Sequence, residues 1–141
     1  VQFYLHRPGS WGAGRIFKIS DENNPAISVN TNSIDYYAEK HGKPDVIKMD
    51  IEGSEVFAIE GAQNLLARED APLLMIEFHP NEIIEASVGN ITMNKLIDKI
   101  HGYGYKSYKI FELHEQNPTW FVFSKKEIPQ SILTTFTERG N

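Results

Sequence analysis

Three carboxylates lie within six residues of one another, in the run Asp50-Ile51-Glu52-Gly53-Ser54-Glu55. Gly53 permits a sharp turn or the close approach of a ligand, because it has no side chain. Packing alone gives no reason to gather so much negative charge, and this favours a functional interpretation of Asp50 and Glu52. Glu55 is more simply a solvated residue in the first turn of a helix, where the helix dipole favours an acidic side chain.

A second polar group, Glu77 and His79, follows the apolar run Leu73-Leu74-Met75-Ile76. A histidine beside carboxylates is a reasonable general base, because neighbouring negative charge holds its proton more tightly. The alternative is structural, since a histidine at a strand end often hydrogen-bonds a backbone carbonyl. The two groups together could also hold a hard divalent cation through oxygen ligands. Nothing in the spacing enforces octahedral geometry, and we assign no metal ligand.

Two apolar strands and one helix must position these groups. The hydrophobic pattern predicts strands at residues 46–51 and 73–76, joined by a helix over residues 54–67. The two strands should be parallel and joined by a right-handed crossover through this helix, so their carboxyl ends should meet at the edge where open sheets bind ligands. The side chains expected to lie within reach of one shared ligand are Asp50, Glu52, Glu77 and His79.

Further elements flank this unit. Capping residues and hydrophobic spacing predict helices at residues 34–41, ended by Gly42, and from residue 93 to the stop at Gly102, capped by Thr92. Short strands are predicted at residues 2–5, 16–19 and 26–30, an antiparallel hairpin at 105–113 and 119–124, and a surface tail at 125–141. The side chains expected to be buried are Val46, Ile47, Met49, Leu73, Leu74 and Ile76, with Leu96, Ile97 and Ile100 packed over the sheet.

The composition restricts the class of protein. A length of 141 residues without repeats or linkers predicts a single domain over residues 1–141. The net charge of -5 argues against non-specific binding to nucleic acid or to an anionic membrane. No apolar run approaches the roughly 20 residues that span a bilayer. The absence of cysteine excludes disulfide scaffolds, cysteine nucleophiles and thiolate zinc sites, and it is compatible with the cytoplasmic location that we predict.

The run from Asp45 to Glu55, D-V-I-K-M-D-I-E-G-S-E, resembles the signature of FkbM-type methyltransferases, together with the Gly61-Ala62 and Leu65-Leu66 pairs that follow it. Residues 29–35 resemble the segment that leads into this signature, and residues 74–80 resemble the family's next strand with its acidic end. The resemblance covers residues 26–80, whereas residues 81–124 agree in architecture only.

The resemblance implies an α/β fold with a Rossmann-like methyltransferase sheet, in which parallel core strands are followed by a terminal antiparallel hairpin. It also implies O-methyl transfer from S-adenosylmethionine to a hydroxyl of a sugar or small metabolite. Asp50 then positions the cofactor or the acceptor in the methyl-transfer crevice, Glu52 and His79 are candidate bases, and Glu77 orients them. The family's cofactor fingerprint, a Gly-rich turn followed by an acidic ribose ligand, has no counterpart here, so the chain resembles the C-terminal half of such a domain.

Two other functions are compatible with the same residues. The chain could be a non-catalytic remnant that serves binding or assembly, or a metal-dependent carboxylate enzyme.

In a complete methyltransferase of this type, the strand at residues 46–51 pairs with a strand that is absent here. Its free edge should be covered, because unpaired strand edges template further pairing. Either an N-terminal strand or a second copy of the chain would cover it, and a homodimer is the better candidate because the N-terminal strands are short.

Overall fold

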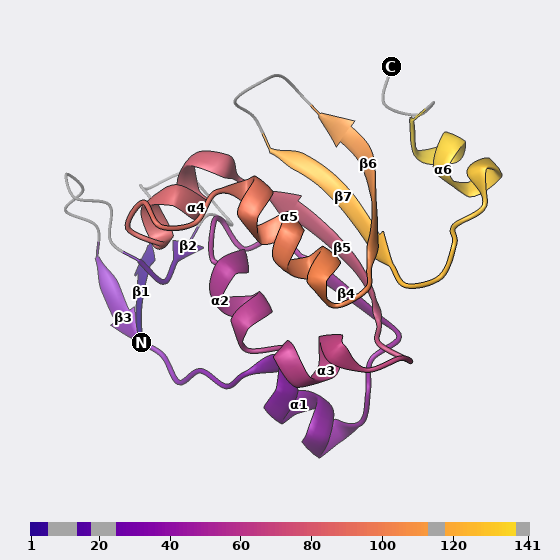
Figure 1. The fold of residues 1–141 in the computed structure, drawn as a ribbon. Coiled ribbons are helices and arrows are strands. Elements are labelled where there is room, and N and C mark those ends of the chain that lie inside the picture. The colour runs from indigo at the N-terminus through magenta and orange to yellow at the C-terminus, as the bar shows by residue number, and fades with distance from the viewer. Residues whose placement is uncertain (6–13, 18–24, 113–117, 138–141) are drawn as a thin grey trace.

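The computed structural model describes residues 1–5, 14–17, 25–112 and 118–137, which form a mixed α/β structure (Figure 1). The strands are β1 (Gln2–Leu5), β2 (Gly14–Arg15), β3 (Ala26–Ser28), β4 (Val46–Met49), β5 (Leu73–Phe78), β6 (Lys106–Glu112) and β7 (Thr119–Ser124). The helices are α1 (Ile34–His41), α2 (Glu55–Glu60), α3 (Gln63–Ala67), α4 (Pro80–Ala86), α5 (Met93–Gly102) and α6 (Gln130–Thr137). Within the described ranges, no helix has the length and apolar character needed to cross a bilayer.

The central sheet has four strands in the order β4-β5-β7-β6. β4 and β5 are parallel, and Met49 lies opposite Ile76. β7 runs antiparallel to both β5 and β6. The structure therefore confirms the parallel core pair and the antiparallel hairpin, in a sheet that is mixed overall. The N-terminal strands form a separate three-stranded sheet in the order β2-β1-β3.

Two helices, not one, connect β4 to β5, so the single helix predicted over residues 54–67 is wrong. The carbonyl of Gly61 accepts the N–H of Asp35 at 2.8 Å. The carboxylate of Asp35 in turn accepts the N–H groups of Asn64 and Leu65, at 3.0 and 2.9 Å. These contacts from α1 satisfy backbone groups at the end of α2 and at the start of α3, so the chain can break its helix here without leaving them unpaired.

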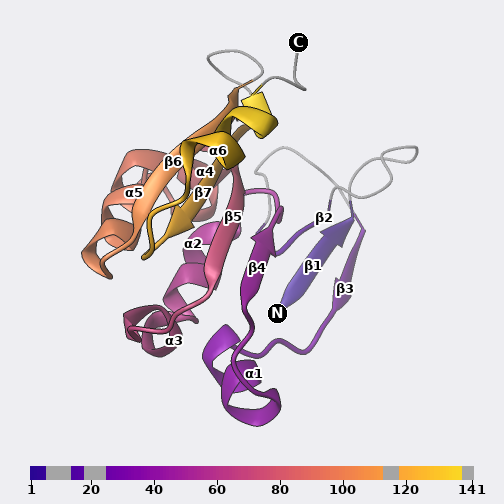
Figure 2. The same ribbon diagram turned by 90° about the vertical axis from the view of Figure 1, so that its right-hand side faces the viewer.

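One face of the central sheet carries the core and is covered by α2, α4 and α5 (Figure 1). Burial alternates along β5, so Leu74, Ile76 and Phe78 are fully buried while the residues between them are half-buried. The apolar run Leu73-Leu74-Met75-Ile76 is typical of a strand that is buried on both faces, and this prediction is wrong for β5. α6 lies over β6 and β7, and therefore it does not cover the second face of β4 and β5 (Figure 2). The predicted core residues that are buried are Met49, Leu74, Ile76, Leu96 and Ile100, and those that are half-buried are Ile47, Leu73 and Ile97.

Among the strands that the structure describes, β4 lies at the edge of its sheet, and this explains several differences from the prediction. Val46 is 57% exposed, although its sequence context predicts burial, because it points to the open face of the sheet. The strand also ends at Met49 and does not continue to Ile51. β1 pairs with β2 on one side and with β3 on the other, so the N-terminal strands do not cover the edge of β4 by pairing with it. The homodimer across this edge stays a prediction.

Smaller differences concern single elements. The N-terminal strand predicted at 16–19 is observed at Gly14–Arg15 instead, with a bend at residues 16 and 17, and residues 18 and 19 lie outside the described ranges. α5 continues through Gly102, and the glycine with a positive φ, 90°, is Gly104. α4 and α6 are helices that the hydrophobic pattern does not predict.

Candidate functional site

The loop after β4 has a backbone conformation that few residues tolerate. Glu52 has a φ of 53° and Gly53 a φ of 88°, both in the left-handed region. For Glu52 this conformation costs about 1–2 kcal/mol. A Cβ atom at Gly53 would lie 2.5 Å from the Cβ of Glu82, so the loop packs directly against α4 and requires glycine there. Such strain in a surface loop motivates the hypothesis that Glu52 has a functional role.

The four predicted site residues gather at the carboxyl ends of β4 and β5. The Nε2 atom of His79 is 3.9 Å from Oδ1 of Asp50, and its Nδ1 atom is 3.8 Å from Oε2 of Glu52. Glu77 interacts with Asp50 through a side-chain hydrogen bond. The two strands are parallel and in register, and therefore their ends bring these groups to the same edge. The expected proximity is observed, while the catalytic roles of these residues stay predictions.

The surroundings of Glu77 raise its pKa. Burial raises the pKa of Glu77 above its ordinary value, and the negative charge of Asp50 and the hydrogen bond to it raise that pKa further. His79 and a hydrogen bond from Trp120 act in the opposite direction. Glu77 is therefore harder to ionise than an ordinary glutamate.

Two basic side chains that the sequence pattern does not single out contact these carboxylates. The Nζ atom of Lys48 is 3.1 Å from Oδ2 of Asp50 and 5.1 Å from the ring centroid of Trp120. Arg15 is 13% exposed, and its Nη2 atom is 3.9 Å from Oε2 of Glu52 and 3.5 Å from Oε1 of Glu82. Lys48 could have been found from its position two residues before Asp50, whereas Arg15 has no local signal because its partners are distant in the sequence.

Glu55 departs most from its predicted environment. It is 0% exposed, although the sequence suggests a solvated residue in the first turn of a helix. Its Oε1 atom accepts the N–H of Ile51 at 3.3 Å, and its Oε2 atom has no hydrogen-bond partner within the described ranges. Burial raises the pKa of Glu55 above its ordinary value, although backbone hydrogen bonds and the charge of His79 partly oppose this. A carboxyl group at this position is therefore costly to ionise.

We expect Glu55→Gln to stabilise the protein at neutral and alkaline pH. The folded-state pKa is raised, so the parent loses stability as the pH rises from the unfolded pKa through the folded one, whereas glutamine does not ionise. The gain should be about 1 kcal/mol or more near pH 8 and smaller in acid, because a buried charge costs more than a buried amide. Thermal denaturation over a pH series measures it.

The matched control is Glu60→Gln in the same helix, because the Glu60 side chain is 51% exposed and lies 3.6 Å from Lys99. Its effect should be small at every pH. A difference between Glu55→Gln and the parent that does not change with pH would contradict the assignment of a raised pKa.

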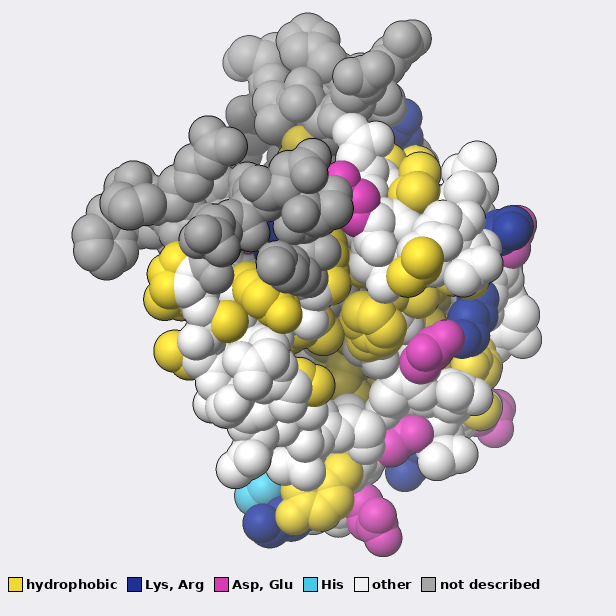
Figure 3. All heavy atoms as spheres, turned by 90° about the vertical axis from the view of Figure 1, so that its left-hand side faces the viewer, with side chains coloured by type: hydrophobic (Ala, Val, Ile, Leu, Met, Phe, Trp, Pro, Cys, Tyr) yellow, Lys and Arg dark blue, Asp and Glu magenta, His cyan; other side chains and the backbone are white. Residues whose placement is uncertain are grey.

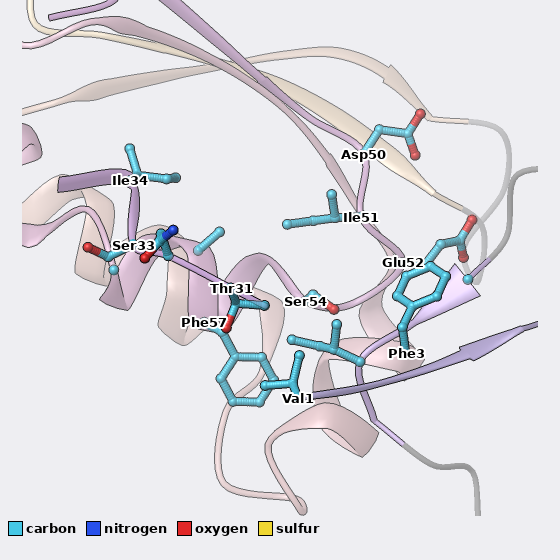
Figure 4. A pocket seen from close by; sticks show the side chains of 15 residues that line it. Val1, Phe3, Thr31, Ser33, Ile34, Asp50, Ile51, Glu52, Ser54 and Phe57 are labelled. Carbon is cyan, nitrogen blue, oxygen red and sulfur yellow. The ribbon is translucent and has the colours of Figure 1, made fainter. Parts of the chain in front are cut away.

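A pocket of about 770 Å³ adjoins the acidic loop. It lies between β1, the segment before α1, the loop after β4, and α2, and most of its lining is apolar. Asp50 and Glu52 lie at one end of it, and Val1 and Phe57 lie toward the other (Figure 4). On the face that carries the N-terminal strands, hydrophobic side chains gather around a hollow (Figure 3). The volume is within the range of about 300–1,000 Å³ that is typical of small-molecule sites.

Comparison with known proteins gives a significant match to a family model. The family model described as the methyltransferase FkbM domain matches residues 2–107. The match is wider than the resemblance at residues 26–80, because it includes the N-terminal strands and continues through α5 to the start of β6. No curated protein and no solved structure matches significantly.

Proposed function

The chain belongs to the FkbM methyltransferase domain family, and we propose that it transfers a methyl group from S-adenosylmethionine to a hydroxyl of a sugar or small metabolite. The observation that carries this proposal is the cluster of Asp50, Glu52 and His79 at the ends of two parallel strands, beside a pocket of small-molecule size. The chain acts as a partial methyltransferase domain within a longer or reassembled enzyme. A Rossmann-like sheet is part of the proposal, and the parallel pair β4–β5 with its helical crossover supports it.

The pocket fits S-adenosylmethionine in size and in charge. Its apolar walls, including Ile51 and Phe57, suit the adenosine part of the cofactor, and the carboxylates of Asp50 and Glu52 suit its positive charge. When bound, S-adenosylmethionine supplies an electrophilic methyl carbon. The role of these residues is to hold cofactor and acceptor in line. Alignment alone can lower the activation barrier of the transfer by up to roughly 7–11 kcal/mol.

The acceptor hydroxyl must lose its proton as the methyl group arrives. His79 is the main candidate base, because its ring lies between Asp50 and Glu52 at the ends of the two parallel strands. Glu52 is the second candidate, since its carboxylate lines the pocket directly. Glu77 holds Asp50 in place through their hydrogen bond. A positioned base of this kind contributes roughly 10²–10⁴-fold to a rate.

Isothermal titration calorimetry with S-adenosylmethionine tests the proposal on this chain. We expect saturable binding that weakens by about tenfold or more in Phe57→Ala, because that side chain lines the pocket. Tyr36→Ala is the matched control, since Tyr36 is a comparably exposed aromatic residue, 44% against 41%, that does not line the pocket. Its affinity should equal that of the parent.

A folded chain that gives no binding heat would favour the alternative, a non-catalytic remnant that serves binding or assembly. One observation favours this alternative: the β4 edge is unpaired within the described ranges, and Val46 on it is exposed. Such an edge is a template for strand pairing with another chain. Binding that is equally strong in Phe57→Ala and in the parent would place the cofactor outside the pocket.

A further inference from the structure

We propose that Asp50, Glu52 and His79 form a binding site for a divalent transition-metal cation. One potential ligand atom from each of the three residues lies within 4.8 Å of the other two. The contacts of His79 with Asp50 and Glu52, at 3.9 and 3.8 Å, are too long for hydrogen bonds. The two contacts involve opposite ring nitrogens, Nε2 and Nδ1, and only one of them can bind the ion. A small side-chain movement must therefore bring the three ligand atoms to the separation of about 3–4 Å that two ligands at roughly 2.1 Å from one ion require.

Unpartnered buried atoms point to the same place. The Nε2 atom of His79 is shielded from solvent and has no hydrogen-bond partner within the described ranges, and the same holds for Oε2 of Glu55. Glu55 is fully buried, and its other oxygen accepts the N–H of Ile51, so its carboxyl group is directed at the loop between Asp50 and Glu52. Buried polar atoms nearly always have a partner, and an ion in the cluster would supply one to Nε2 of His79, whereas Glu55 is not one of the three clustered residues.

The charges around the cluster also favour a cation. In the described part of the chain, Arg15 is shared among Glu52, Glu82 and Glu85, so one positive charge serves three carboxylates. Lys48 pairs with the Oδ2 atom of Asp50, whereas the Oδ1 atom of Asp50 faces His79. Negative charge therefore exceeds positive charge at the loop, and a bound divalent cation would offset the excess.

The donor set restricts the metal. Two carboxylates and one imidazole suit Mn²⁺, Fe²⁺ or Zn²⁺ better than Mg²⁺ or Ca²⁺, which prefer oxygen ligands alone. Three protein ligands leave coordination positions free, and Asp50 and Glu52 border the pocket from which an acceptor would enter. With the ion bound, the cation would replace His79 in lowering the pKa of an acceptor hydroxyl, because a ring nitrogen that binds a metal cannot accept a proton. This role rests on the proposed function, whereas the binding of the ion does not.

Electron paramagnetic resonance with Mn²⁺ alone tests the site, in the absence of S-adenosylmethionine. We expect one ion per chain and a coupling between the bound Mn²⁺ and a nitrogen nucleus. His79→Gln should remove the nitrogen coupling, and Asp50→Asn should weaken Mn²⁺ binding by at least about tenfold. Excess Zn²⁺ should displace the Mn²⁺. Circular dichroism verifies that each variant is folded, which is expected for Asp50→Asn because that side chain is 40% exposed.

Two control variants separate this site from general binding to acidic or histidine side chains. Asp45→Asn changes a carboxylate that is 99% exposed, and His41→Gln changes a histidine outside the cluster, which stacks on Tyr37. Both should bind Mn²⁺ as the parent does and keep the nitrogen coupling. Absence of Mn²⁺ binding, binding without nitrogen coupling, or equal affinity in Asp50→Asn and the parent would overturn the proposal, whatever the calorimetry with S-adenosylmethionine shows.

Discussion

Asp50→Asn should lower the rate of methyl transfer by more than about tenfold in the active form of the protein, which corresponds to roughly 1.4 kcal/mol of transition-state stabilisation. The substitution keeps the shape of the side chain and removes its negative charge. That charge lies 3.9 Å from His79 and 3.1 Å from Lys48, and it borders the pocket. Formation of S-adenosylhomocysteine with a panel of hydroxyl-bearing sugars and small metabolites measures the rate.

Asp45→Asn is the matched control for this prediction. Asp45 precedes the same strand and carries the same functional group, but its side chain is 99% exposed and its contact is with Lys43. The control should retain the activity of the parent, and both variants should unfold at nearly the parent temperature because both carboxylates are accessible to solvent. Equal turnover in Asp50→Asn and the parent would remove Asp50 from the active site.

Leu74→Ala should reduce the free energy of unfolding by about 2–5 kcal/mol. Leu74 is 0% exposed and lies in the middle of the sheet, between Ile47 on β4 and Phe123 on β7. Truncation removes apolar contacts and leaves a cavity that these neighbours can fill only in part. Because small domains have about 5–15 kcal/mol of stability in total, a loss of this size would be visible as a large shift in the urea midpoint.

Leu5→Ala is the comparison, because the same truncation then acts on a side chain that is 40% exposed in β1. It should cost well under half as much as Leu74→Ala, since less apolar surface is returned to water. Similar losses in the two variants would mean that β5 is not the centre of the core. An unchanged urea midpoint in Leu74→Ala would contradict the burial of this residue.

Local sequence signals determined the elements that form through contacts between neighbouring residues. Ser33 and Thr92 cap their helices by accepting the N–H groups of Tyr36 and Lys95, and those bonds depend only on residues three positions apart. The parallel order of β4 and β5 follows from the short helical connection between them. The sequence could therefore predict that the four site residues lie close together. Asp50 and Glu52 follow β4, and Glu77 and His79 lie at the end of β5.

Only the tertiary structure decided the features that depend on segments distant in the sequence. Val46 is exposed because β4 lies at the edge of the sheet and α6 covers other strands, which no pattern within β4 can indicate. The helix after β4 breaks because the backbone and carboxylate of Asp35 bind groups at its middle. Contacts between distant segments also bury Glu55 and bring Arg15 to Glu52 in the loop after β4. The sequence alone determined which acidic and histidine side chains follow the two parallel strands. The packing of distant segments decided their burial and their partners, because those depend on the surroundings of each group in the folded chain.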